Sequence, residues 1–438
     1  MKRVVTDRLE AWASSPRRKP LLVRGARQVG KTWAVTAFAQ KRFPGHTHVL
    51  DLERRRDLHH IFAGDLSATR LLSQLELSLG AGITPGQDLL FLDEIQACPR
   101  AIVALRYFYE ELPALHVVAA GSLLEFAFGQ FSFPVGRVQF LTVHPMTFLE
   151  FLWATGREAA SEIARGEPAA VDPATHATLL EFLREYLFVG GLPEAVRLYA
   201  ESGRLRDAFH AQDEVVQAYR ADFSKYAPRV DGNTLDEVLT SVARTVGAQV
   251  VYSRLAAGPT QPTLKNAFGL LERAQVVQRV TAVKHMGLPP GADATLRRFK
   301  AIVVDLGLLH RLSGVPIDAE HAKTDLLSIY EGALAEQFVG QELCAAGDGD
   351  LYYWARAAKS STAEVDYLLV RRDRLVPVEV KSGPGGRLRS MHQLLKEHPQ
   401  CAPGVVLSTA PYAELPEQDL VFVPLYYAGV LMRSATIT

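Results

Sequence analysis

The stretch RGARQVGKT, residues 24–32, decides the fold of this chain because it contains the pattern GxxxxGK(S/T). It follows the apolar run PLLV (20–23), typical of a buried strand, and it opens a helical stretch, as the P-loop motif requires. In such a loop, backbone N–H groups and a helix N-terminus bind phosphates. A lysine at position 31 neutralises the β- and γ-phosphates, and a hydroxyl at position 32 holds Mg²⁺. The pattern predicts a site for ATP and Mg²⁺ built from Gly25, Ala26, Arg27, Gln28, Val29, Gly30, Lys31 and Thr32.

A second apolar run, LLFLDEI (89–95), ends in two acidic residues. Asp93, emerging from a buried strand, is predicted to bind Mg²⁺ together with Thr32. Glu94 beside it is placed to polarise an attacking water as a general base. The combination of this run with the P-loop predicts ATP hydrolysis as well as ATP binding.

Two further residues fit this site by position. Ser122 ends the run HVVAAGS (116–122), so its hydroxyl is expected near the γ-phosphate, with a strand-end cap as the alternative. Arg137 is a candidate arginine finger that faces a phosphate of its own chain or of a neighbouring chain. The alternative for Arg137 is a surface salt bridge.

The N-terminal third alternates apolar runs with helical stretches. The runs at 20–25, 48–53, 89–94, 116–122 and 138–143 are expected to be buried strands. Short apolar runs between helical segments predict a parallel sheet with crossover helices, and hence an α/β fold. We expect this P-loop core to span residues 1–155.

The rest of the chain divides by pattern into three parts. Residues 156–230 are expected to form a helical lid, and residues 231–298 a winged-helix-like domain of three short helices and a strand. Residues 299–438 are expected to hold a connector, up to about 330, and then a helix, three strands, a helix and further strands. Overall composition is ordinary for a globular protein, with 48 basic and 48 acidic residues.

The net charge of zero neither favours nor excludes nucleic acid, because binding depends on the local field. The three cysteines lack CxxC spacing, so a disulfide framework or zinc site is not expected. Reduced cytoplasm fits this usage. No window approaches 18 uninterrupted apolar residues, so no membrane span is expected.

Charged side chains interrupt two apolar strands in EVDYLLVRRDRLVPVEVKSG (364–383). Residues two apart in a strand share a face, so Asp366, Glu379 and Lys381 converge if the strands form a hairpin. Paired carboxylates predict a Mg²⁺ site, to which Glu336 on the preceding helix adds a third carboxylate. The alternative is an exposed face with cross-strand ion pairs.

These residues resemble the PD-(D/E)xK nuclease superfamily, whose signature is an Asp on one strand, (D/E)xK on the next and often a Glu on the first helix. The whole order of motifs is similar to the AAA+ family of bacterial and archaeal ATPases with a C-terminal domain of unknown function. Those motifs are GARQVGKT, LDEIQ, GSLL, HPMTFLEF, GGLPEAV, DLGLL and EVDYLLV…VPVEVKSG. The resemblance implies a P-loop AAA+ module with a helical lid, a winged-helix-like middle and a PD-(D/E)xK-like C-terminus. Two departures are GSLL in place of a hydroxyl-rich run, and Leu306 where a Thr is usual.

Three functions remain open from the sequence. In the first, ATP hydrolysis controls Mg²⁺-dependent cleavage of DNA, with Asp366, Glu379 and Lys381 as catalytic residues, and the winged-helix-like segment, including Arg273, holds the duplex. In the second, the C-terminal domain does not cut and serves as a DNA or protein docking module. The third is a metabolic or signalling NTPase without a nucleic-acid role. A ring or dimer is expected if Arg137 acts on a neighbouring chain.

Overall fold

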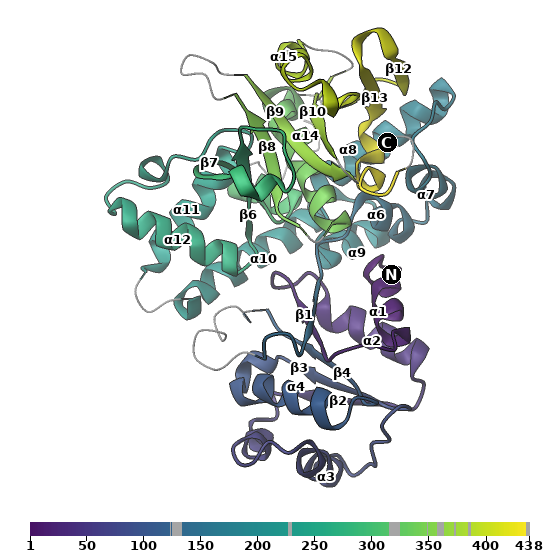
Figure 1. Cartoon of the computed structure of the whole chain (residues 1–438), viewed down its shortest axis with the longest axis vertical. Helices are drawn as coiled ribbons and strands as arrows, with labels where there is room; N and C mark the ends of the chain where they lie inside the picture. The colour runs from purple at the N-terminus through teal and green to yellow at the C-terminus, as the bar shows by residue number, and fades with distance from the viewer. Residues whose placement is uncertain are drawn as a thin grey trace. The chain divides into compact units, whose positions relative to one another are not determined.

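The structure is a computed structural model of the chain. It describes residues 1–122, 124, 134–226, 230–314, 325–347, 349–356, 363–371, 374–383 and 387–434. The chain divides into two compact units, which are Lys2–His144 and Pro145–Thr438 together with Met1 (Figure 1). The division falls earlier than the expected boundary at residue 155. No helix among the residues that the structure describes is long and apolar enough to span a membrane.

The N-terminal unit is built on a five-stranded sheet in the order β2-β3-β4-β1-β5. Every neighbouring pair is parallel, and β3 and β4 are buried along their whole length, as expected for strands covered on both faces. All five predicted strands and the parallel α/β arrangement are thereby confirmed. The strands are β1 (Leu21–Arg24), β2 (Thr47–Asp51), β3 (Leu89–Asp93), β4 (His116–Ala120) and β5 (Gln139–Thr142).

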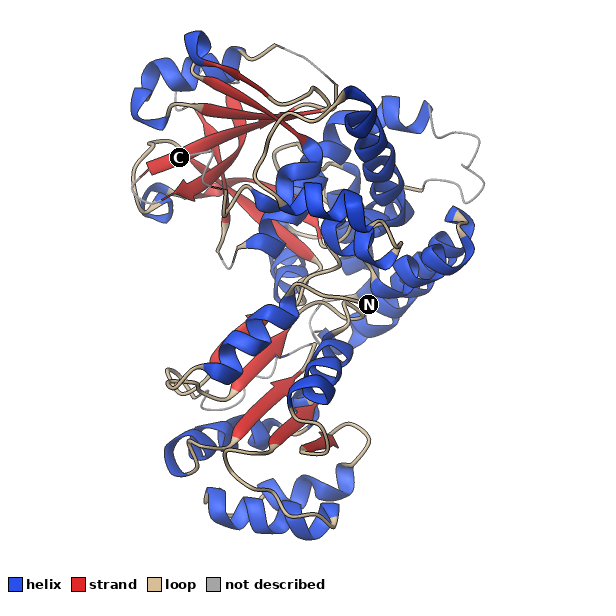
Figure 2. Ribbon diagram, turned by 90° about the vertical axis from the view of Figure 1, so that its right-hand side faces the viewer, coloured by secondary structure: helices blue, strands red, loops and turns tan. Residues whose placement is uncertain are grey.

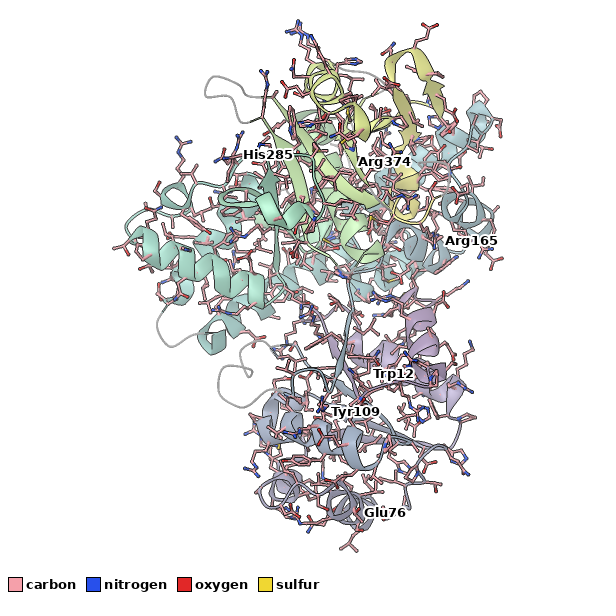
Figure 3. The ribbon with its side chains drawn as sticks, in the orientation of Figure 1. Trp12, Glu76, Tyr109, Arg165, His285 and Arg374 are labelled. Atoms are coloured by element: carbon pink, nitrogen blue, oxygen red, sulfur yellow. The ribbon has the colours of Figure 1, made fainter. Side chains whose placement is uncertain are left out.

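Helices cover this sheet and bury an apolar core, in which side chains from β3 and β4 pack with those of α3 and α4. The helix α1 packs against α2, and its Trp12 Nε1 donates to the Lys19 carbonyl at 2.8 Å, just before β1 begins (Figure 3). The helices of this unit are α1 (Val5–Ser14), α2 (Lys31–Arg42), α3 (Ala68–Leu79) and α4 (Pro99–Glu111), with 3₁₀ turns η1 (Arg56–Phe62) and η2 (Ile95–Ala97).

The second unit combines helices with an eight-stranded mixed sheet in the order β12-β13-β11-β10-β9-β8-β6-β7 (Figure 2). Its strands are β6 (Val277–Val283), β7 (Thr295–Val303), β8 (Leu351–Ala355), β9 (Glu364–Arg371), β10 (Arg374–Val380), β11 (Gly404–Ser408), β12 (Ala413–Leu415) and β13 (Leu420–Pro424). The predicted hairpin is present: β9 and β10 are antiparallel, with Tyr367 opposite Val378.

The helices of the second unit include those expected to form a lid. They are α6 (Phe148–Ala154), α7 (Glu158–Arg165), α8 (Pro173–Val189), α9 (Pro193–Ser202), α10 (Leu205–Tyr226), α11 (Gly232–Arg244), α12 (Gln261–Arg273), α13 (Leu306–Leu312), α14 (Asp325–Ala346) and α15 (Arg389–Glu397). The 3₁₀ turns are η3 (Tyr252–Arg254), η4 (Pro290–Asp293), η6 (Pro399–Cys401), η7 (Pro416–Gln418) and η8 (Leu425–Val430).

The segment after residue 298 is more than the expected connector. Its first residues complete β7, which pairs with β6 and joins the same sheet as β8, β9 and β10. The helix α13 then follows, capped by Asp305. The prediction of a connector here was wrong because β7 begins with several polar residues and only its end is apolar, so the sequence pattern did not indicate one continuous strand.

Three of the sequence motifs meet inside the second unit. Asp305 of DLGLL accepts a hydrogen bond from the Gly191 amide of GGLP at 2.6 Å. The Gly191 carbonyl in turn accepts from the Met146 amide of HPMTFLEF at 2.6 Å. A Cβ on Gly191 would lie 2.0 Å from the Met146 carbonyl oxygen, so only glycine allows this approach. The motifs therefore hold α6, α9 and α13 together.

Candidate functional sites

The parallel sheet of the N-terminal unit brings the predicted nucleotide-binding residues to one edge. The P-loop follows β1, Asp93 is the last residue of β3, and Ser122 lies two residues after β4. The strands β3, β4 and β1 are neighbours in the sheet, so their carboxyl ends lie side by side. Ligands of open α/β sheets bind at this edge.

The P-loop backbone has the conformation that its glycines permit. Gly30 has φ 88° and is the N-cap of α2, while Gln28 has φ 64°. At Gly25, with φ 154°, an added Cβ would lie 2.3 Å from the Val143 carbonyl oxygen. A side chain at position 25 would therefore push the loop away from the end of β5.

Lys31 is the first residue of α2 and its side chain is buried within the loop. Its Nζ donates to the carbonyl oxygens of Gly25 at 3.0 Å and Ala26 at 2.8 Å. Burial lowers the pKa of Lys31 to about 8, although Glu94 and Asp93 act in the opposite direction. The ammonium thus lies inside the turn of backbone that the motif assigns to phosphate.

Asp93 and Thr32, which are predicted to hold Mg²⁺, lie in contact with each other. The Thr32 hydroxyl is hydrogen-bonded to the Asp93 carboxylate, and burial raises the pKa of Asp93 despite that bond. Oxygen ligands of this kind suit Mg²⁺, so the residues present fit the ion. If Mg²⁺ binds here, Thr32 and Asp93 would hold it, and it would supply positive charge that stabilises the transferring phosphate.

Glu94 adopts a backbone conformation that is uncommon for a residue with a side chain. Its φ is 47° and its ψ is 45°, and such outliers concentrate at functional sites. Gln96 holds the Glu94 side chain by donating Nε2–H to Oε2 at 2.5 Å. Gln96 also lies under Gly121, where an added Cβ would be 2.2 Å from its Oε1. The run LDEIQ therefore fixes the predicted general base through a glutamine that sequence reasoning did not single out.

Arg3 is a second residue that sequence reasoning missed. Its guanidinium is buried and donates to the Val29 carbonyl of the P-loop at 3.1 Å and to the His144 carbonyl at 2.7 Å. It thereby ties the loop to the end of β5. No sequence pattern around the N-terminus identifies this role, which depends on the tertiary fold.

Arg137 does not lie with the other residues of the nucleotide site. It precedes β5, close to Lys19, whose Nζ donates to the Gly136 carbonyl at 2.7 Å before β1 begins. It is therefore at the amino edge of the sheet, opposite the P-loop. Its Nε donates to Glu110 Oε1 at 2.8 Å, and the side chain is 46% exposed. This geometry is the surface salt bridge given above as the alternative for Arg137, and a role as an arginine finger toward a neighbouring chain stays a prediction.

The charged residues of the C-terminal sheet gather around a lysine that the sequence analysis did not select. Lys300 on β7 places its Nζ 3.0 Å from Glu336 Oε1, 3.1 Å from Glu364 Oε1 and 3.3 Å from Asp366 Oδ1. Burial acts to lower the pKa of Lys300, but the three carboxylates outweigh it and raise that pKa. Burial and Asp366 raise the pKa of Glu336, and Lys300 opposes that shift.

Glu379 and Lys381 lie beside this group. Lys381 Nζ is 2.6 Å from Glu379 Oε1, and the Val380 amide between them donates to Asp366 Oδ2 at 2.9 Å. The hairpin thus brings the three predicted residues together. Burial raises the pKa of Glu379, while Lys381 opposes the shift. We call Lys300, Glu336, Glu364, Asp366, Glu379 and Lys381 the carboxylate–lysine cluster.

The carboxylate–lysine cluster does not fit a metal ion as it stands. Within the described part of the chain, no group of three or more His, Cys, Asp or Glu side chains is arranged to hold one. Three of the carboxylates are instead directed at the Lys300 ammonium. The binding of Mg²⁺ by Glu336, Asp366 and Glu379 therefore stays a prediction from the sequence.

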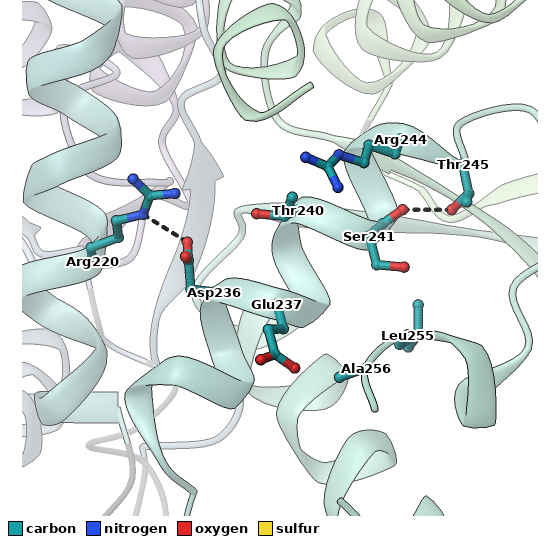
Figure 4. A pocket seen from close by; sticks show the side chains of 9 residues that line it. All are labelled: Arg220, Asp236, Glu237, Thr240, Ser241, Arg244, Thr245, Leu255 and Ala256. Atoms are coloured by element: carbon teal, nitrogen blue, oxygen red, sulfur yellow. Dashed lines mark hydrogen bonds and ion pairs between the residues drawn. The ribbon is translucent and has the colours of Figure 1, made fainter. Parts of the chain in front are cut away.

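A pocket of about 540 Å³ lies among α10, α11 and the residues that follow η3 (Figure 4). Arg220 and Arg244 line it together with Asp236 and Glu237, and Arg220 Nε donates to Asp236 Oδ1 at 2.7 Å. Two cations and two carboxylates balance each other there, so the pocket does not concentrate one charge.

Comparisons with known proteins divide the chain into three matched regions. Residues 17–152 match an AAA domain, residues 180–318 match a domain of unknown function (DUF8612), and residues 331–427 match another (DUF4143). The sequence matches no curated protein. Residues 17–152 thus match an AAA domain, and the loop at 25–32 within them has the backbone conformation that its glycines permit.

Several solved structures are similar to the chain at low identity. The Walker-type ATPase PABY2304 of Pyrococcus abyssi is 16% identical over 70% of this chain and 94% of its own, with a TM-score of 0.43. The Aeropyrum pernix Orc1 protein in complex with DNA is 15% identical over 73% and 95%, with a TM-score of 0.30. The Thermotoga maritima RuvB Holliday junction branch migration motor is 18% identical over 71% and 95%, with a TM-score of 0.30.

Proposed function

We propose that the chain binds and hydrolyses ATP with Mg²⁺ in its N-terminal unit. The observation that carries this proposal is the contact of Lys31 Nζ with the P-loop carbonyls, next to the hydrogen-bonded pair of Thr32 and Asp93. In this proposal Lys31 binds the β- and γ-phosphates, while Thr32 and Asp93 hold Mg²⁺. Glu94, fixed by Gln96, accepts a proton from the attacking water. Ser122 lies near the γ-phosphate.

Two substitutions separate ATP binding from hydrolysis. Lys31→Ala is expected to abolish binding of a fluorescent ATP analogue. Glu94→Gln is expected to retain binding and to lower phosphate release about 10²-fold or more, the usual contribution of a general base. Lys41→Ala is the matched control, because Lys41 lies on the same helix and is 74% exposed. Unchanged ATP turnover in folded Lys31→Ala or Glu94→Gln would overturn the proposal.

We further propose that the second unit is a docking module for DNA that the ATPase state controls. The order of α11, η3 and α12 followed by the antiparallel pair β6 and β7 supports this, since it is the order of a winged helix. The exposed face of α12, which includes Lys265 and Asn266, is the expected contact surface. Docking is favoured over cutting because Lys300 lies among the carboxylates that cleavage would need.

A fluorescence-anisotropy titration with labelled duplex DNA at low salt tests this second part. Binding is expected, with a weaker affinity for Lys265→Ala and a steep decrease in affinity with added salt. Plasmid incubated with the protein and Mg²⁺ or Mn²⁺ is expected to stay intact. Absence of DNA binding at low salt would favour an NTPase without a nucleic-acid role. Nicking that Asp366→Ala abolishes would instead favour the cutting enzyme.

A further inference from the structure

We infer that the Lys300 ammonium takes the place of a divalent metal ion in the C-terminal sheet, so that the carboxylate–lysine cluster is closed to Mg²⁺ and Mn²⁺. Its corollary is that removing this single charge opens a divalent-cation site. The inference concerns the same second unit that we propose to dock DNA, but it does not depend on ATP hydrolysis or on DNA binding.

The geometry around Lys300 Nζ is that of a saturated cation. An ammonium has three donors, and three carboxylates from α14 and β9 lie within 3.0 to 3.3 Å of it. A metal ion sharing these oxygens at its usual distances of about 2.0–2.6 Å would sit within a few ångströms of the ammonium. Like charges at that separation repel strongly in a buried site. The lysine and the metal therefore exclude each other.

The fold fixes Lys300 in this position. It lies on β7, opposite Val280 of β6, and its side chain is only 2% exposed. The Nζ lies 5.3 Å from the centre of the Tyr353 ring on β8, so the lysine reaches from β7 toward β9 along this face of the sheet. Leaving the cluster would deprive the carboxylates of their counter-charge, which is costly chiefly for Glu336 and Asp366, because these side chains are 12% and 15% exposed.

A second, independent feature indicates that a divalent cation binds when Lys300 is removed. Glu379 is 6% exposed, and its Oε2 has no hydrogen-bond partner among the described residues. The neighbouring Asp366 is close enough to influence the charge of Glu379. Without the ammonium, the free oxygen of Glu379, together with Asp366 and Glu336, offers the hard oxygen ligands that Mg²⁺ and Mn²⁺ prefer.

The test is a titration of the full-length, nucleotide-free protein with MnCl₂ alone, in which electron paramagnetic resonance measures free Mn²⁺. Wild type and Asp366→Asn are expected to give the same titration, since Asp366 binds no metal when Lys300 is present. Lys300→Met is expected to bind one additional Mn²⁺ per chain at least tenfold more tightly than any site of the wild type. Adding Asp366→Asn to Lys300→Met should remove that ion.

Lys396→Met is the control for loss of a lysine, because Lys396 is exposed on α15. If Lys300→Met does not fold, Lys300→Gln replaces it, because glutamine keeps a hydrogen-bond donor in place without the charge. This variant is also expected to bind one additional Mn²⁺ per chain. A wild-type Mn²⁺ site that Asp366→Asn abolishes would overturn the inference. So would a folded Lys300 variant that gains no Mn²⁺.

Discussion

Replacing Asp305 by Ala should destabilise the second unit more than the loss of an ordinary helix cap. The Asp305 carboxylate is fully buried and accepts from the amides of Gly191 at 2.6 Å, Gly307 at 2.8 Å and Leu308 at 3.3 Å. A buried N–H left without a partner costs about 1–3 kcal/mol, so the two short bonds amount to roughly 2–6 kcal/mol. Burial raises the pKa of Asp305 to about 6, which shows that its charge is itself costly. Removing that charge offsets part of the loss, and we expect a decrease of about 3 kcal/mol in the free energy of unfolding.

Urea unfolding followed by far-ultraviolet circular dichroism measures this difference. Asp172→Ala is the matched control, because Asp172 caps α8 through the amides of Ala174 and Thr175 but is exposed and makes no bond between motifs. Loss of such an exposed cap should cost less than loss of Asp305, because water can replace the lost acceptor. Asp305→Asn retains one acceptor and should fall between the two. If Asp305→Ala costs no more than Asp172→Ala, the reasoning that the buried bond to Gly191 joins the motifs is refuted.

Three further predictions concern the side chains of His310 and Arg137 and the backbone at Gly25. Burial lowers the pKa of His310 to about 4, below its unfolded value near 6.5, so stability is lost as pH falls through this window, by up to about 3 kcal/mol. In urea titrations at a series of pH values, His310→Gln should flatten the dependence of the free energy of unfolding on pH. An unchanged slope of that free energy against pH would contradict the role given to His310. Arg137→Ala breaks an exposed ion pair with Glu110, so it should leave stability nearly unchanged, and in ATPase assays it should lower turnover only at concentrations where chains self-associate. Gly25→Ala places a Cβ against the Val143 carbonyl and should weaken ATP binding at least tenfold in a fluorescence titration, without loss of helical signal.

The sequence predicts most of the N-terminal unit because local pattern and tertiary role agree there. Each strand is a short apolar run, and the residues that follow β1 and β3 are the ones the motif requires. Prediction was poorer where a strand is apolar over only part of its length. The strand β7 begins TLRRFKA, so its polar residues hide its place in a mixed sheet. The boundary at 155 likewise rested on helical pattern, which does not reveal the unit against which a helix packs.

In the candidate sites, too, local pattern predicts some residues, and only the tertiary fold reveals others. Sequence spacing predicted that Asp366, Glu379 and Lys381 meet on one hairpin, because strand periodicity determines which residues share a face. It could not supply Lys300, which reaches the cluster through the order of four strands, β9-β8-β6-β7. A lysine followed by the apolar run AIVV is nevertheless a local signal, since a buried ammonium requires a partner of opposite charge. The Lys300 ammonium on β7 therefore complements the surplus of carboxylates on β9, β10 and α14. The balance of buried charge across the sheet, rather than the nuclease-like spacing alone, thus distinguishes a lysine-filled cluster from a metal site.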